Sequence, residues 1–190
     1  MEKPFWLDQE FTKQDYSKVK LPKGDYENCR FVDCLFTEGY LDNQNFVECT
    51  FEGCDFTNSN IAQSIFNDVT FIGCKMVGVQ FDSCNPILLS FNFQACNLSL
   101  ASFYNMDIPK TTFLDCKLHQ VDFSEAQLPK ADFSNSDLDN AIFSSTNLEQ
   151  VDFSTAFNFN IDPTQNKIKK AKFSKDGLIG LLKKYDIVVT

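Results

Sequence analysis

The chain is poor in the residues that catalytic and ligand-binding motifs require. Among its 190 residues there is one histidine, His119, and its seven glycines form neither a Walker motif nor a Gly-x-Gly-x-x-Gly loop. No stretch approaches the roughly 20 consecutive apolar residues of a membrane span. The start, Met1-Glu2-Lys3-Pro4, lacks the basic and apolar parts of a secretory signal. We therefore expect a cytoplasmic protein without membrane contact, with no cofactor and no catalytic residue, and not an enzyme.

A five-residue periodicity organises most of the chain. An apolar residue recurs at every fifth position from Tyr26 to Phe81 and again from Leu88 to Phe153, and the same phase reaches back to Phe11. This period matches neither the 3.6-residue turn of an α-helix nor the two-residue alternation of a flat strand. The residue two positions before each apolar centre is small or compact. A chain that turns a corner every five residues would keep all these centres inside.

The segment Ala131-Asp132-Phe133-Ser134-Asn135 shows the pattern cleanly, and residues 24–157 as a whole resemble the pentapeptide-repeat family. The resemblance implies an all-β fold, a right-handed quadrilateral β-helix of about seven coils with four pentapeptides per turn. Residues 20 apart should then stack. If two residues are inserted between Phe81 and Leu88, one column consists only of phenylalanine: Phe31, Phe51, Phe71, Phe93, Phe113, Phe133 and Phe153.

The eight cysteines follow this repeat and not a pairing pattern. Two inward columns hold seven of them: Cys34, Cys54, Cys74, Cys96 and Cys116 on one, and Cys29 and Cys49 on the other. Parallel, in-register Cβ vectors suit the disulfide torsion poorly, and no paired histidines accompany the thiols as in a zinc site. We expect reduced core thiols, no disulfide and no metal.

Three segments are expected along the chain. Residues 1–20 should cover the N-terminal end of the coil, residues 21–157 form the repeat, and residues 158–190 form a capping or dimerisation segment. The ends need covering because an exposed end layer presents unpaired strand edges. Asn85-Pro86 is a turn signal, so the insertion should form a small bulge at a corner.

Charge divides unequally between coil and tail. Residues 161–190 hold seven lysines against three aspartates, a net charge of +4. Residues 1–160 hold ten basic and 23 acidic residues, a net charge of −13. The coil is therefore expected to be an acidic rod with a basic tail.

The tail is predicted to contain a short C-terminal α-helix from about Lys175 to Tyr185, with Ser174 as its N-cap. An extended segment, Ile187 to Val189, should follow. The apolar residues of the tail would either cap the last coil within the chain or form a homodimer interface, the usual way to hide an apolar end. The predicted dimerisation residues are Leu178, Leu181, Leu182, Ile187 and Val188.

The tail also carries a closer resemblance. Asn160 to Ile168, Gly177 to Leu182 and Asp186 to Val189 resemble the tails of the microcin-immunity and quinolone-resistance pentapeptide-repeat proteins. This resemblance implies a homodimer joined through the C-terminal segments, with bacterial DNA gyrase or topoisomerase IV as partner, bound by imitating duplex DNA. The quinolone-resistance members carry longer loops than the two-residue insertion here, which favours the immunity-like members.

Seven acids occupy outward positions of the last coils and are the predicted partner-binding residues: Asp122, Glu125, Asp132, Asp137, Asp139, Glu149 and Asp152. Their field would attract a basic DNA-binding groove, although ordinary solubilising charge would look the same. The leading hypothesis is a non-enzymatic DNA mimic that protects a topoisomerase from a poison, as in toxin immunity or quinolone resistance, without binding nucleic acid itself. The alternative is a scaffold that binds another protein through outward apolar residues such as Leu35, Tyr40, Leu100 and Tyr104.

Overall fold

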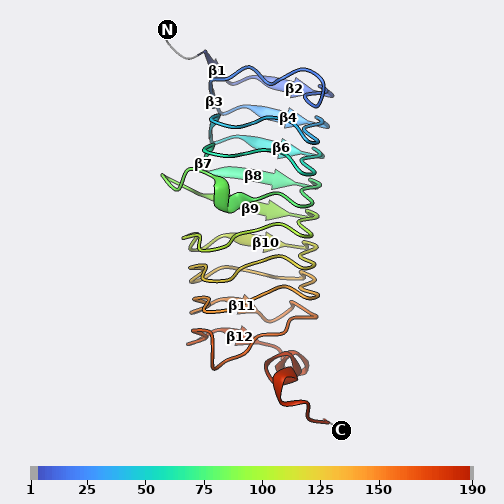
Figure 1. Cartoon of the computed structure of the whole chain (residues 1–190), viewed down its shortest axis with the longest axis vertical. Coiled ribbons are helices and arrows are strands. Elements are labelled where there is room, and N and C mark those ends of the chain that lie inside the picture. Colours follow the sequence, from blue (N-terminus) through green and yellow to red (C-terminus); the bar gives the residue numbers. More distant parts are fainter. Residues whose placement is uncertain (1–3, 189–190) are drawn as a thin grey trace.

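Short parallel strands stack along the long axis of the molecule (Figure 1). The computed structural model describes residues 4–188. One sheet contains β1 (Phe5–Leu7), β3 (Asp25–Glu27), β5 (Asn45–Val47) and β7 (Ile65–Asn67). A second contains β2 (Glu10–Thr12), β4 (Arg30–Val32), β6 (Thr50–Glu52), β8 (Val69–Ile72), β9 (Phe91–Gln94) and β10 (Thr112–Leu114). β11 (Asp152–Phe153) pairs with β12 (Lys172–Phe173) near the C-terminal end. The predicted all-β quadrilateral β-helix is confirmed, with about eight turns.

The turns place four faces around a filled interior. The β1 face carries the first sheet and continues through Ile108, Leu128, Leu148 and Ile168, and the β2 face carries the second sheet and β11 with β12. The other two faces are the Phe36 face and the Leu41 face, each called after one of its buried residues. Strand partners are 20 residues apart, as in Phe51 opposite Phe71, which confirms four pentapeptides per turn.

The core is a stack of aromatic rings. On the β2 face, phenylalanines from Phe11 to Phe173 form an unbroken column of stacked pairs, with ring centroids 4.7–5.4 Å apart. The column thus extends one turn beyond the predicted Phe31 at one end and one turn beyond Phe153 at the other. Rings on adjacent faces meet edge to face, as Phe113 and Phe123 do. Because identical layers stack, each ring finds an offset partner above and below.

Corners require a left-handed backbone. The residue two positions after most of the buried centres has a positive φ, for example 52° at Asp33 and 59° at Asn135. Asparagine, aspartate and glycine adopt this left-handed conformation at the lowest conformational energy, since most other side chains clash with the backbone there. This explains why these residues recur at corners.

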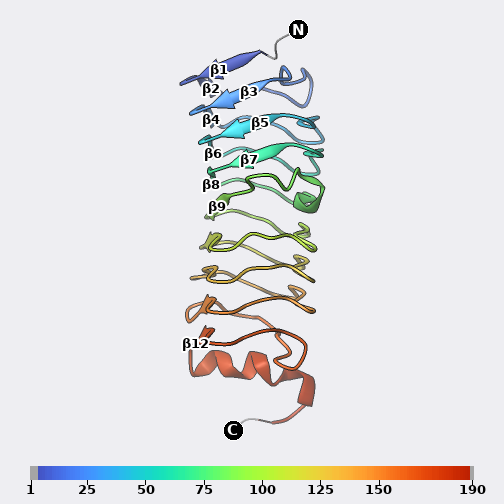
Figure 2. The same ribbon diagram turned by 90° about the vertical axis from the view of Figure 1, so that its left-hand side faces the viewer.

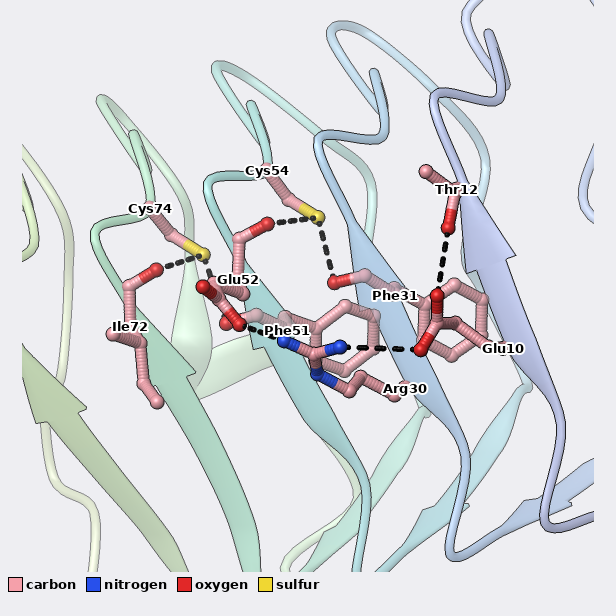
Figure 3. A network of polar contacts seen from close by, with 9 residues as sticks. All are labelled: Glu10, Thr12, Arg30, Phe31, Phe51, Glu52, Cys54, Ile72 and Cys74. Carbon is pink, nitrogen blue, oxygen red and sulfur yellow. Dashed lines mark hydrogen bonds and ion pairs between the residues drawn. The ribbon is translucent and has the colours of Figure 1, made fainter.

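The predicted core thiols are confirmed: all eight cysteines are free and buried. In the column from Cys34 to Cys116, each thiol lies within hydrogen-bond distance of one or two backbone carbonyl oxygens. Cys54 Sγ, for example, is 3.4 Å from the Phe31 oxygen of the preceding turn and 3.5 Å from the Glu52 oxygen (Figure 3). The thiols therefore satisfy carbonyl groups inside the coil. Outside, Arg30 bridges Glu10 and Glu52 on neighbouring turns, with nitrogen to oxygen distances of 3.1 and 2.5 Å (Figure 3).

The two-residue insertion is confirmed. The residue predicted to point into the coil interior after it, however, is wrong. Phe71 pairs with Phe93, an offset of 22 residues in place of 20. Leu88, the predicted inward centre, is 69% exposed, whereas Phe91 is buried and lies against Phe66. The chain makes a 3₁₀ turn, η1 (Phe81–Ser83), and then a loop that projects from the β1 face (Figure 1). Counting residues placed Leu88 in phase, but the larger ring of Phe91 fills the interior.

The C-terminal helix is of a different type from the predicted α-helix. Two 3₁₀ helices, η2 (Asp176–Leu181) and η3 (Lys183–Tyr185), lie across the end of the coil (Figure 2). Ser174 accepts a hydrogen bond from the Gly177 amide, as expected of an N-cap. Gly177 and Gly180 both face the Phe159 ring. A 3₁₀ helix has three residues per turn and so puts residues three apart on one side, which lets both glycines approach that ring.

The remaining terminal residues join the coil or extend from it. In the segment predicted to cover the N-terminal end, 1–20, β1 and β2 belong to the same sheets as the repeat, and Trp6 stacks on Tyr26. Ile187 and Val188 are exposed and belong to no strand, and Val189 lies outside the described residues.

Candidate functional site

The seven acids predicted to bind a partner lie on all four faces and do not form one patch. Asp132 and Asp152 follow Thr112 on the β2 face, and Asp137 follows Lys117 on the Phe36 face beside Asp139. Asp122 follows Ser102 on the Leu41 face, with Glu125 at the next corner, and Glu149 lies on the β1 face beside Asn147. The acids therefore encircle the last turns. A groove that contacts one side of the rod meets only some of them.

Two of these acids are paired within the chain. Lys172 lies 2.8 Å from Asp152 and, with Ser154, lowers the pKa of that carboxyl to about 2. His119 Nε2 lies 2.6 Å from Asp137 Oδ2. Partial burial raises the pKa of Asp137, but hydrogen bonds from His119 and Asn158 outweigh it, so that the pKa lies below its usual range. A paired carboxylate attracts a distant partner less strongly.

The other five acids make no ion pair within the described part of the chain. They are Asp122, Glu125, Asp132, Asp139 and Glu149. Asp122 and Asp132 accept hydrogen bonds from the backbone amides of Ser124 and Ser134, two residues further on. Each carboxylate thereby stabilises the local backbone turn that follows it. Glu125 and Asp139 are exposed and Glu149 is half-buried. These three are the freest to meet a partner.

The predicted dimerisation residues divide into two groups. Leu181 is half-buried against the core and Leu182 is also partly covered, so they help to cap the last coil. Leu178, Ile187 and Val188 are exposed. The Lys184 ammonium, 2.7 Å from Asp162, ties η3 to the coil and lowers the pKa of Asp162 to about 2. The tail thus caps the coil and still presents apolar side chains at the molecular end.

Two shallow pockets flank residues 157–160 at this end. One, of about 450 Å³, lies between residues 154–159 and η2, and the other, of about 520 Å³, lies between residues 139–143 and Lys184. Within residues 4–188, no three His, Cys, Asp or Glu side chains are placed to hold a metal ion. None of the described helices is both long and apolar enough to cross a membrane.

Sequence reasoning missed a pattern along one corner. Where the β1 face turns into the β2 face, the corner residues in successive turns are Asp8, Asn28, Glu48 and Asp68 before the loop, and Lys110, Lys130, Gln150 and Lys170 after it. The acidic half and the basic half thus share one edge of the rod. The signal was present in the spacing of 20 residues, but it was applied only to inward positions.

Comparisons with known proteins agree with this architecture. The profile described as a pentapeptide repeat region matches residues 44–113 and 79–153. No curated protein sequence matches the chain. Among solved structures, a trypsin-treated form of QnrB1, a plasmid-mediated fluoroquinolone resistance protein, is similar with a TM-score of 0.65 and 18% identity, covering 100% of this chain and 92% of that one.

A second similar structure is that of HetL, a pentapeptide repeat protein involved in heterocyst differentiation regulation from the cyanobacterium Nostoc. Its TM-score is 0.57 with 15% identity, and the similarity covers 92% of this chain and 86% of that one. Both likenesses concern the fold, since proteins with the same fold often have unrelated functions. The profile match spans more than half of the chain, its repeats coincide with the stacked turns, and this chain belongs to the pentapeptide-repeat family.

Proposed function

We propose that this protein is a non-enzymatic, DNA-mimicking binding protein that engages bacterial DNA gyrase or topoisomerase IV and protects it from a poison. The observation that carries the proposal is a straight rod with a net charge of −13 over residues 1–160. Eight steps of about 4.8 Å make the rod about 38 Å long. Two rods joined end to end would match roughly 20 base pairs at about 3.4 Å each. The similarity to QnrB1 is in accord with this proposal.

The distribution of charge decides which residues would make contact. Glu125, Asp139 and Glu149 are unpaired within the described residues and lie on different sides of the last turns. A groove that encloses the rod, as a DNA-binding groove encloses a duplex, would reach all three. Long-range attraction of this kind raises association rates and weakens as salt is added.

The test is a gyrase supercoiling assay, with and without a poison. We expect the wild-type protein to alter supercoiling, and a variant with Glu125→Gln, Asp139→Asn and Glu149→Gln to lose much of this effect and of its salt sensitivity. A control with Asp33→Asn, Glu38→Gln and Asp82→Asn removes the same number of charges from exposed positions in the N-terminal half of the rod. Equal losses in both variants would show that only net charge matters. No effect of the wild type on either topoisomerase would exclude the proposal.

A scaffold function is the second candidate, and one observation favours it. Leu35, Tyr40, Leu100 and Tyr104 are 43–54% exposed on the Phe36 and Leu41 faces and the corner between them. Exposed apolar side chains that gather on one side often mark a protein-binding surface. Binding through them should be nearly independent of salt, whereas binding through the acids should weaken steeply. Salt dependence of partner binding thus separates the two functions.

A further inference from the structure

The charged corner between the β1 and β2 faces has a regular order. Counted outward from the loop at Ile87 and Leu88, the corner residues on the N-terminal side are Asp68, Glu48, Asn28 and Asp8. Counted outward on the C-terminal side they are Lys110, Lys130, Gln150 and Lys170. Each acid therefore has a lysine at the same number of turns on the other side of the loop. The one neutral amide on each side also falls at the same distance, three turns from the loop.

Outside the corner, the N-terminal half of the β1 face is acidic and the C-terminal half has no net charge. Asp25 and Glu27 lie on β3, while Lys167 and Lys169 lie on the last turn. Asp107 and Glu149 are the acids of the C-terminal half. Within residues 4–188, neither the three acids and three lysines of the corner nor Asp25, Glu27, Lys167 and Lys169 make an ion pair. The other three corners show no such division; the one after the β2 face, for instance, begins with Lys13 and continues with Asp33 and, after the loop, Asp115.

An apolar loop separates the acidic and basic halves. The loop leaves the coil where the Asn85 amide donates to Ser64 and returns where the Ser90 amide donates to Phe66. Between these points Ile87 is 61% exposed and Leu88 is 69% exposed. The loop projects from the same side as β7 (Figure 1), and this side faces the viewer in Figure 2. An apolar centre flanked by charges is the usual composition of a protein interface.

We infer that the β1 face binds a second copy of this chain, side by side and antiparallel. A two-fold axis that lies in the interface, perpendicular to the rod at the loop, brings the same corner of both copies together. Asp68 of one copy then lies opposite Lys110 of the other, Glu48 opposite Lys130, and Asp8 opposite Lys170. Asn28 lies opposite Gln150, so two amides meet where no charges do. The two loops meet on the axis.

The chemistry of this surface determines how the association behaves. The corner charges are exposed, and single exposed ion pairs contribute little to stability. Several pairs in register, each made twice by symmetry, give orientation and specificity. Because exposed charges are screened over about 8 Å at physiological salt, the dimer should form best at low salt. The inference does not rest on the proposed function, because it needs neither a topoisomerase nor the exposed tail residues. The two proposals share one residue, Glu149, which lies on the β1 face and would be covered in the paired rods.

A charge-swap experiment tests the pairing, with sedimentation at low salt as the measurement. One variant carries Lys110→Glu, Lys130→Glu and Lys170→Glu, and the other carries Asp8→Lys, Glu48→Lys and Asp68→Lys. Alone, each places like charges opposite each other, and its self-association should weaken at least about tenfold. Mixed in equal amounts, the two should form a heterodimer at wild-type strength. The control, Lys13→Glu, Lys117→Glu and Lys175→Glu, changes the net charge as much as the lysine variant but lies away from the β1 face, and should associate like the wild type.

A cross-link tests the orientation. Asn28→Cys and Gln150→Cys in one chain should give a covalent dimer on mild oxidation, because the second copy brings each new thiol opposite the other. The native thiols are buried and stay unreacted. Dimers joined only through their tails would hold these positions far apart and remain uncrosslinked. The inference is overturned if the wild type is monomeric at low salt, if the mixture fails to restore association, or if the lysines instead bind single-stranded DNA while no self-association occurs.

Discussion

Phe113 illustrates how single residues hold this coil together. Its side chain is fully buried, with ring centroids 5.2 Å from Phe93 and 4.9 Å from Phe133. Its neighbour Leu114 points outward and is half-buried. One residue of β10 thus belongs to the core and the next to the surface, as alternation along a strand requires.

We expect Phe113→Ala to lower the free energy of unfolding by about 3–5 kcal/mol, because it removes a buried ring and leaves a cavity between two others. Leu114→Ala on the same strand should cost less than about 1 kcal/mol. Thermal and denaturant unfolding measure both. Equal losses would contradict the inward placement of the phenylalanine column.

At the scale of elements, the C-terminal 3₁₀ helices depend on one close contact. A Cβ atom at Gly180 would lie 2.5 Å from the Phe159 ring and 2.7 Å from its carbonyl oxygen. Gly180 O also accepts a hydrogen bond from the Ile161 amide. The helix can approach the coil this closely only because the position has no side chain.

Gly180→Ala should therefore weaken the docking of η2 by about 1–3 kcal/mol, since overpacking forces the backbone apart. Asp176→Ala, an exposed position of the same helix, should change stability by less than about 0.5 kcal/mol. Hydrogen exchange of residues 176–185 measures the docking directly. Unchanged protection in the glycine variant would show that the helix is held elsewhere.

The same element separates capping from dimerisation. Leu178→Glu changes a side chain that is 47% exposed, so it should leave thermal unfolding unchanged and yield a smaller species in light scattering. Leu181→Glu places a carboxylate against the core, where an unpaired charge is costly, and should lower the melting temperature. If the wild type has the mass of one chain at tens of micromolar, the tail is a cap only.

At the scale of the whole molecule, the buried thiols couple stability to pH along the rod. Burial raises the pKa of the Cys49 thiol to about 12, from an ordinary value near 9.0. It likewise raises the pKa of Cys84. In the unfolded chain such thiols lose their protons near pH 9, whereas in the folded chain they keep them. The unfolded state then binds fewer protons, so stability is full below pH 9 and is lost as pH rises toward 12.

We expect the free energy of unfolding to fall by about 1.4 kcal/mol per pH unit above pH 9 for each such thiol. Denaturant unfolding between pH 7 and pH 11 checks this. Cys49→Ala removes one titrating group, so its stability should start lower and decline less steeply. A stability that is flat across this range would contradict the burial of the thiols.

The sequence by itself determined the inward positions. A five-residue period places Phe31, Cys34 and their successors inside, because each corner is a local backbone geometry that repeats, and 20-residue stacking follows by counting.

Only the tertiary structure decided the rest. Phe91 replaced Leu88 in the interior because packing, and not phase, selects the residue that fills an insertion. η2 became a 3₁₀ helix because Phe159 lies beneath its glycines. Asp137 and Asp152 are paired and not free to meet a partner, because His119 and Lys172 reach them from neighbouring turns. The stacking of turns decides which charges share a face. Stacking brings together residues that are far apart in the sequence, so it is a property of the folded rod.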